Sequence, residues 1–262
     1  KTEVAQRLRA EVADVVDRQI ACGLDSVNNG EIGKTNFTNY VRERLAGFEA
    51  RTYKGGEGPK PLSIASRDVK RFPEYFASGG RGFGAFAGSG PSKSQVFCVE
   101  PLRYVGQQSL KEDLDNFRAA LKGKSVAEAF LPANTPGTIE HWLRNEHYPS
   151  EEAFVYAIAD VMREEYLAIV EGGFTLQIDD PDVADGWQMY PEMTVGQYRD
   201  YAELRIAALN HALRGIPREK VRIQYNMYQE PEDMACMIRG MRLCREFFAQ
   251  EPLRSMISGE VF

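Results

Sequence analysis

Short apolar segments alternate with amphipathic helical segments along most of this chain, and this alternation is the feature that most constrains its fold. We expect strands at residues 24–28, 96–99, 127–131, 174–179 and 221–225. Apolar residues at three- and four-residue spacing predict helices at 3–22, 38–47, 110–122, 138–145, 151–171 and 194–214. Strands that alternate with helices form crossover units, so the sequence predicts an α/β fold with a parallel sheet.

The strand at 174–179 favours a barrel over an open sheet. Its polar residues alternate with the apolar Leu176 and Ile178, so the two sets lie on opposite faces. A barrel places apolar residues toward its helices and polar residues toward a site near the catalytic rim. A doubly wound sheet is covered on both faces and would show a more continuous apolar run. We therefore predict a (β/α)8 TIM-barrel-like fold.

Five recognisable strands cannot close an eight-stranded barrel, because strand number fixes its diameter and tilt. An open parallel sheet would leave two unpaired edges, which tend to pair with other chains. We expect either further strands within the Gly- and Pro-rich loop excursion at 51–92, or edges covered by a predicted helix at 231–249 or by a partner subunit. A homo-oligomer, or a sequence that is part of a longer chain, is expected over a stable monomer. Residues 1–222 would form the barrel domain and 223–262 a helical C-terminal segment.

Composition restricts the classes of partner. The 262 residues include 32 Lys and Arg against 38 Asp and Glu, a net charge of −6, without the basic stripe that nucleic-acid binding needs. No apolar run reaches the roughly 18 residues of a membrane span, and we see no signal-peptide core near the first residues. Four scattered cysteines are too few for a disulfide framework. We expect a cytoplasmic protein that binds neither nucleic acid nor membrane.

Polar residues follow the predicted strands, at the edge where ligands bind in parallel α/β proteins. Glu31 and Asp179 are the candidate catalytic carboxylates. Asp180 should face the other side of its strand and Asp182 should be a turn or cap residue, so these aspartates do not predict a three-ligand metal site. A turn or a helix cap is the alternative for each motif, since these are also ordinary turn residues. The candidate substrate-binding residues are Asn29, Asn134, Gln177 and, in a polar loop, His147.

The sequence shows no metal or dinucleotide motif. It contains neither Cys-x-x-Cys nor His-x-Cys, and no histidine lies within ligand spacing of a cysteine. The glycine-rich stretch 82–88 follows no convincing strand and departs from the dinucleotide pattern. We predict neither NAD nor flavin binding.

Several separate blocks give residues 1–222 a family resemblance. They are Asn29-Gly-Glu31-Ile-Gly33, Asn39 to Phe48, Pro136-Gly137, Tyr148-Pro-Ser150, Glu165-Tyr166 and Gln177-Ile-Asp-Asp-Pro181, in the family's order. This region resembles the catalytic domain of cobalamin-independent methionine synthases, which share a (β/α)8 barrel with uroporphyrinogen decarboxylases.

The resemblance implies transfer of a methyl or other alkyl group from a small-molecule donor to a small-molecule thiol. In that family the residues matching Asp179 and Glu31 contact the polar end of the thiol substrate. The family also implies zinc, held in part by a His-x-Cys, but the corresponding place reads Gln224-Tyr-Asn226. An alternative is therefore a non-catalytic binding or assembly protein that kept the barrel and lost the zinc site.

Residues 224–262 resemble a different family, the C-terminal region of glucose/methanol/choline oxidoreductases. The similarity stops before that family's active-site histidine, and no flavin-binding GxGxxG precedes it. We assign no oxidoreductase role to this segment.

Overall fold

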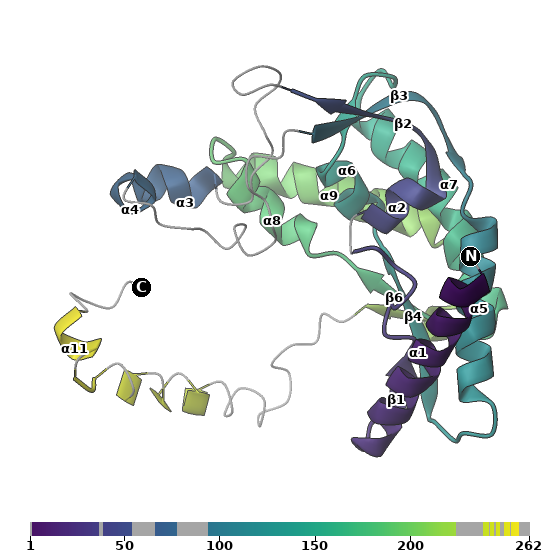
Figure 1. The fold of residues 1–262 in the computed structure, drawn as a ribbon. Helices are drawn as coiled ribbons and strands as arrows, with labels where there is room; N and C mark the ends of the chain where they lie inside the picture. Colours follow the sequence, from purple (N-terminus) through teal and green to yellow (C-terminus); the bar gives the residue numbers. More distant parts are fainter. Residues whose placement is uncertain are drawn as a thin grey trace. The chain divides into compact units, whose positions relative to one another are not determined.

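The computed structural model describes residues 2–36, 39–53, 66–77 and 94–223, and parts of 238–256 (Figure 1). The chain divides into two compact units, Lys1–Arg222 and Ile223–Phe262. In the second unit, the described residues include short helical pieces and α11 (Leu253–Met256). The first unit carries every candidate site residue and both sheets, except for Ile223 at the end of the last strand.

A four-stranded sheet forms the centre of the first unit. It contains β1 (Ser26–Asn28), β4 (Glu128–Asn134), β6 (Thr175–Asp179) and β7 (Val221–Ile223), in the order β1-β4-β6-β7. β1 pairs with β4 in parallel, and β4 pairs with β6 in parallel. The predicted α/β fold with a parallel sheet is thus confirmed.

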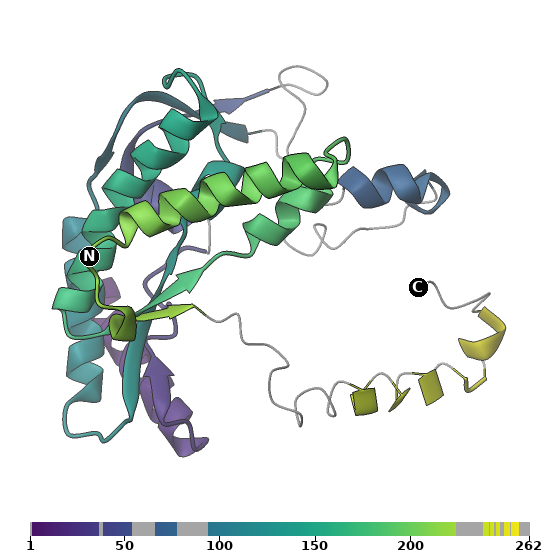
Figure 2. The same ribbon diagram turned by 180° about the vertical axis from the view of Figure 1, so that it is seen from behind.

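Four long helices follow one another as neighbours beside this sheet (Figures 1 and 2). They are α1 (Thr2–Ala21), α5 (Gln107–Leu121), α7 (Glu151–Glu171) and α9 (Val195–Ala212). The predicted caps are present: the Ser150 hydroxyl accepts from the Ala153 amide, and Thr194 and Gln197 form a capping box. α1 packs on β1, and α7 packs on β4 and β6. The core between them is filled by fully buried side chains that include Val16, Phe117, Ile158, Met162 and Leu176.

The strand predicted at 96–99 does not join the parallel sheet. It is part of β3 (Ser94–Tyr104), which pairs antiparallel with β2 (Leu45–Thr52) and parallel with β5 (Arg144–Asn145). The helix predicted at 38–47 ends early, as α2 (Asn39–Arg44). Gly47, expected to end that helix, instead has φ 114° where the β2–β3 register shifts. A bulge of this kind favours glycine because a side chain there is strained.

Two further helix predictions need correction. The helix expected at 138–145 is α6 (Pro136–His141), which begins after the N-cap Thr135 and gives way to β5. Asp182, expected as a turn or cap residue, is the first residue of the helix α8 (Asp182–Met189), after the N-cap Pro181, and is buried. α8 escaped prediction because it is short and follows a run of turn residues. A 3-10 turn, η2 (Arg218–Lys220), precedes β7.

The described part of the excursion at 51–92 contains helices as well as loop. These are α3 (Ser66–Arg71) and α4 (Pro73–Ala77). Arg67 of α3 donates to the carbonyl oxygens of Trp187 (2.7 Å) and Tyr190 (3.1 Å), and its guanidinium lies 3.6 Å from the Trp187 ring centre. Such a donor satisfies carbonyls at the end of α8.

The structure shows four strands in the parallel sheet of the described chain, with β1 and β7 at its edges. The strand found within the excursion, the end of β2, belongs to the second sheet. Most of the helix predicted at 231–249 lies outside the described residues. In the described ranges, no helix has the length and apolar character needed to cross a membrane.

Candidate functional site

The loop after β1 presents Glu31 in a constrained conformation. Glu31 has φ 53°, a left-handed value that is uncommon for a residue with a side chain. The side-chain oxygen of Asn28 accepts from the Gly30 amide (2.8 Å), and that of Asn29 accepts from the Glu31 amide (3.0 Å). Asn29 is 2 % exposed. The structure therefore shows Asn29 shaping the loop that carries Glu31.

Lys34 connects this loop to the end of β4. Its Nζ donates to Glu31 Oε1 and to the Pro132 carbonyl oxygen, both at 2.7 Å. It also lies 4.2 Å from the ring centre of Tyr40, and the side chain is 6 % exposed. Lys34 could not be predicted as a site residue, because a lysine in a polar loop gives no sign that it is buried.

Gln177 and Asp179 lie on the same face of β6, as the alternation predicted. Gln177 Nε2 donates to Asp179 Oδ1 at 2.9 Å. Burial is the main cause that raises the Asp179 pKa, and the negative charge of Glu31 adds to it, while Gln177 and Lys34 oppose the rise. The structure therefore brings Asp179 within electrostatic reach of Glu31 and Lys34.

Asn134 ends β4 directly beside Asp179, which is its register partner on β6. The Asn134 backbone amide donates to the Tyr40 hydroxyl (3.1 Å), and the Tyr166 hydroxyl donates to the Asn134 backbone carbonyl oxygen (2.5 Å). Asn134 is 1 % exposed. Two buried tyrosines thus fix the backbone at this strand end.

A buried charge network lies beside Tyr40, whose ring centre is 5.2 Å from the Arg44 guanidinium. Arg44 Nη1 donates to Glu165 Oε1 at 2.9 Å, and Arg44 also pairs with Asp113. The Tyr104 hydroxyl donates to Glu165 Oε2 at 2.8 Å. The Glu165-Tyr166 block of the resemblance therefore lies in the core behind the strand ends.

A second polar cluster lies between α6, α8 and α9. His141 Nδ1 is 3.3 Å from the Tyr201 hydroxyl, and His141 Nε2 is 3.6 Å from Asp182 Oδ1. Burial raises the Asp182 pKa to about 7, helped by the charges of Asp185 and Asp180. Burial and Arg205 lower the His141 pKa to about 4. His141 is therefore neutral at pH 7 and supplies no charge to balance Asp182.

Asp180 belongs to this second cluster. Its Oδ1 accepts from the Thr138 hydroxyl and the Val183 amide, both at 3.3 Å. These bonds hold the turn from β6 into α8. The contacts of Asp180 are thus with α6 and α8, while its neighbour Asp179 bonds to Gln177 on β6.

His147 lies in the exposed loop that follows β5, a strand of the second sheet. Its backbone amide donates to Asn145 Oδ1 at 3.2 Å, and its ring packs edge-on against Tyr148. These contacts do not join it to the Glu31–Asp179 group. His211 is paired with Asp160 at 2.6 Å on the outer side of α7 and α9.

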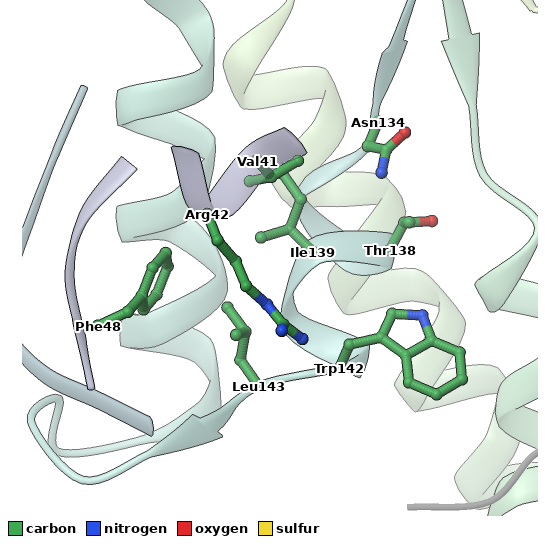
Figure 3. Close-up of a pocket in the computed structure, with 8 residues that line it drawn as sticks. All are labelled: Val41, Arg42, Phe48, Asn134, Thr138, Ile139, Trp142 and Leu143. Carbon is green, nitrogen blue, oxygen red and sulfur yellow. The ribbon is translucent and has the colours of Figure 1, made fainter. Parts of the chain in front are cut away.

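A pocket lies between α2, β2 and α6, near Asn134 (Figure 3). Its volume is about 10 Å³, room for about one water molecule. The Arg42 side chain extends from α2 toward Leu143 and Trp142 at the end of α6 (Figure 3). This pocket is too small for a substrate. The Glu31–Asp179 group is the candidate site because it lies at the strand ends, where parallel α/β proteins bind ligands.

The described residues do not fit the zinc site that the resemblance implies. They contain no group of three or more His, Cys, Asp or Glu side chains placed to hold a metal ion. Cys98 is buried, and burial raises its thiol pKa to about 11, which disfavours the thiolate that zinc needs. Residues 224–226, where the family has its His-x-Cys, lie outside the described chain.

Comparisons with known proteins support the resemblance of the first unit. The methionine synthase of Thermococcus kodakarensis is 23 % identical over 195 residues, 74 % of this chain and 44 % of that protein. The methionine synthase of Pyrococcus furiosus is 26 % identical over 228 residues, 86 % of this chain and 53 % of that protein. The 5-methyltetrahydropteroyltriglutamate–homocysteine methyltransferase of Vibrio cholerae is 25 % identical over 185 residues, 70 % of this chain and 20 % of that protein.

A solved structure agrees with these relatives. The B12-independent methionine synthase of a Shewanella species, in complex with selenomethionine, matches with a TM-score of 0.57 and 18 % identity, over 85 % of this chain and 52 % of that chain. No protein-family model matches, and these comparisons give no support to the oxidoreductase resemblance of residues 224–262. The chain spans about half the length of the two archaeal relatives. It is similar to B12-independent methionine synthases in sequence, and its α/β fold with a parallel sheet matches part of a structure of this TIM-barrel type.

Proposed function

We propose that this protein transfers a methyl or other alkyl group to the thiol of an amino-acid acceptor such as homocysteine. The observation that carries the proposal is the group formed by Glu31, Asp179 and Lys34 at the carboxyl ends of β1, β4 and β6. Both carboxylates lie within electrostatic reach of one buried ammonium, which pairs with Glu31 and leaves the charge of Asp179 without a paired cation. An acceptor that carries an α-ammonium group supplies the charge that is missing.

Asp179 is the carboxylate that would bind this ammonium. Glu31 is already paired with Lys34 at 2.7 Å. Asp179 makes no ion pair among the described residues, and its bond from Gln177 Nε2 fixes the direction of the carboxylate. An ion pair in a partly buried site is stronger than one in water because the surroundings screen it less.

The chemistry forms a sulfur–carbon bond and breaks the bond between that carbon and the donor. The thiol proton passes to water, and the donor leaves with the electron pair of the broken bond. The thiolate is the reactive form of the acceptor. The residues described above bind the acceptor and orient it, and a fixed orientation raises the rate by removing the need for a random encounter. Because the described residues do not fit a zinc site, their contribution to the reaction is this binding and orientation.

Calorimetric titration of the full chain with L-homocysteine tests the acceptor site. The Asp160→Asn variant is a matched control for Asp179→Asn, because Asp160 is an exposed carboxylate paired with His211 on the outer helices. We expect wild type and this control to bind homocysteine equally. Absence of binding by wild type would contradict the proposal, and binding that leads to no transfer from any donor would favour a binding or assembly protein.

A further inference from the structure

We propose that Lys34 is a positioning residue that sets acceptor specificity: it holds Glu31 in place and so reserves Asp179 for the ammonium of the acceptor. This inference rests on the proposed function and deepens it. It arises from contacts that join the loop after β1 to β4 and to Tyr40 of α2 through one buried ammonium group.

The ammonium of Lys34 is fully engaged. Two of its contacts are hydrogen bonds of 2.7 Å, to Glu31 Oε1 and to the Pro132 carbonyl oxygen. The third is the ring face of Tyr40, at 4.2 Å from the ring centre, a distance typical of a cation–π contact. A lysine ammonium has three N–H donors, and because all three are engaged here, none is left to bind a ligand directly. Lys34 therefore acts through the groups that it holds.

These contacts fix the position of Glu31 relative to β4 and β6. The Lys34 amide also donates to the Glu31 carbonyl oxygen at 2.9 Å, which closes the turn around the left-handed Glu31. Pro132 is the register partner of Gln177, the residue that bonds to Asp179. One side chain thus joins the β1 loop to the strand ends that carry the acceptor site.

The charges of Glu31 and Asp179 explain why Lys34 affects acceptor specificity. Without Lys34, Glu31 would be free to move, and its charge would act on Asp179 without a nearby cation. The uncompensated charge of Glu31 favours the protonated form of Asp179, and a protonated carboxyl cannot form an ion pair. A thiol acceptor that lacks the ammonium does not depend on this charge and should be little affected.

The test compares Lys34→Met and Lys34→Arg with wild type, with Lys111→Met as the control, since Lys111 is an exposed lysine paired with Asp115. Each protein is titrated with L-homocysteine and with 4-mercaptobutyrate, which has the same thiol and carboxylate without the amino group. We expect Lys34→Met to weaken homocysteine binding about ten- to hundredfold and to change 4-mercaptobutyrate binding less than about twofold. Lys34→Arg should retain most of the preference, because arginine keeps the charge.

A second measurement does not depend on the proposed function. NMR titration of the Asp179 carboxyl carbon in the ligand-free proteins should show a higher pKa in Lys34→Met than in wild type. Equal loss of both thiols would show a merely structural role and overturn the inference, as would an unchanged Asp179 pKa. If wild type bound neither thiol, the proposed function would fail, and the NMR titration would still decide whether Lys34 governs the charge of Asp179.

Discussion

Asp179 and Asp182 are three residues apart, yet the fold gives them different surroundings. Asp179 is half-buried beside Gln177, on the polar face of β6. Asp182 is 2 % exposed and faces His141. Strand alternation was enough to predict the orientation of Asp179. The burial of Asp182 depends on how α6 and α9 pack around α8, and no pattern within the segment reports that packing.

Replacing Asp179 tests its assignment as the ammonium-binding carboxylate. We predict that Asp179→Asn folds normally and weakens homocysteine binding by roughly 1.5–3 kcal/mol, the range for hydrogen bonds to charged groups. Calorimetric titration measures the change, and thermal unfolding checks the fold. An unchanged dissociation constant would remove Asp179 from the site.

The raised pKa of Asp182 predicts a pH-dependent stability. Its value in the folded chain is about 7, against an ordinary 3.8. Between about pH 4 and 7 the folded state holds a proton that the unfolded state releases, so this group lowers the free energy of unfolding as the pH rises. Asp182→Asn removes that loss. The free energy of unfolding of the variant, relative to that of wild type, should therefore increase from pH 4 to 7 by an amount on the order of a few kcal/mol. Above pH 7 the difference should stay constant.

Urea unfolding at a series of pH values measures this difference. His141 contributes an opposite slope, because its pKa is lowered to about 4 from 6.5, but it is present in both proteins and largely cancels. A stability difference that does not vary with pH would show that Asp182 is ionised throughout this range in the folded protein.

At the scale of elements, the sequence predicts an element well where short-range features such as a helix cap or a terminating glycine determine it. The helix at 151–171 has the predicted bounds because Ser150 caps it and two glycines follow it. β2 was missed because Val41 and Leu45 also fit a helical spacing, while the pairing of 45–52 with β3 is a contact between distant segments. The Arg44–Glu165 pair, 121 residues apart, was invisible for the same reason.

Removing Arg44 should destabilise the packing of α2 against α7. The side chains of Arg44 and Glu165 are 5 % and 1 % exposed, so Arg44→Met leaves a buried carboxylate without its cation. We predict a loss of about 3–5 kcal/mol in the free energy of unfolding. Adding Glu165→Gln should recover part of this loss in chemical denaturation. A loss below about 1 kcal/mol in the single variant would mean that the network relaxes or admits water.

At the scale of the whole molecule, the parallel sheet was predictable and the closure of a barrel was not. In the described chain β1 and β7 form the edges of the sheet, and the chain spans 44 % and 53 % of two relatives. An open parallel sheet tends to find a partner at its edges. We predict that the purified chain is a homo-oligomer, which light scattering coupled to size-exclusion chromatography measures. A monodisperse 29.5 kDa species that unfolds cooperatively would contradict this prediction.

The most direct test of the proposed transferase is the formation of methionine. The full chain is incubated with L-homocysteine and 5-methyltetrahydropteroyltriglutamate, the two substrates after which the Vibrio relative is named, with zinc supplied, and methionine is measured by mass spectrometry. The proposed function predicts methionine formation by wild type and at least about tenfold less by Asp179→Asn. No methionine from a wild-type protein that binds homocysteine would contradict the transferase assignment for this donor and acceptor.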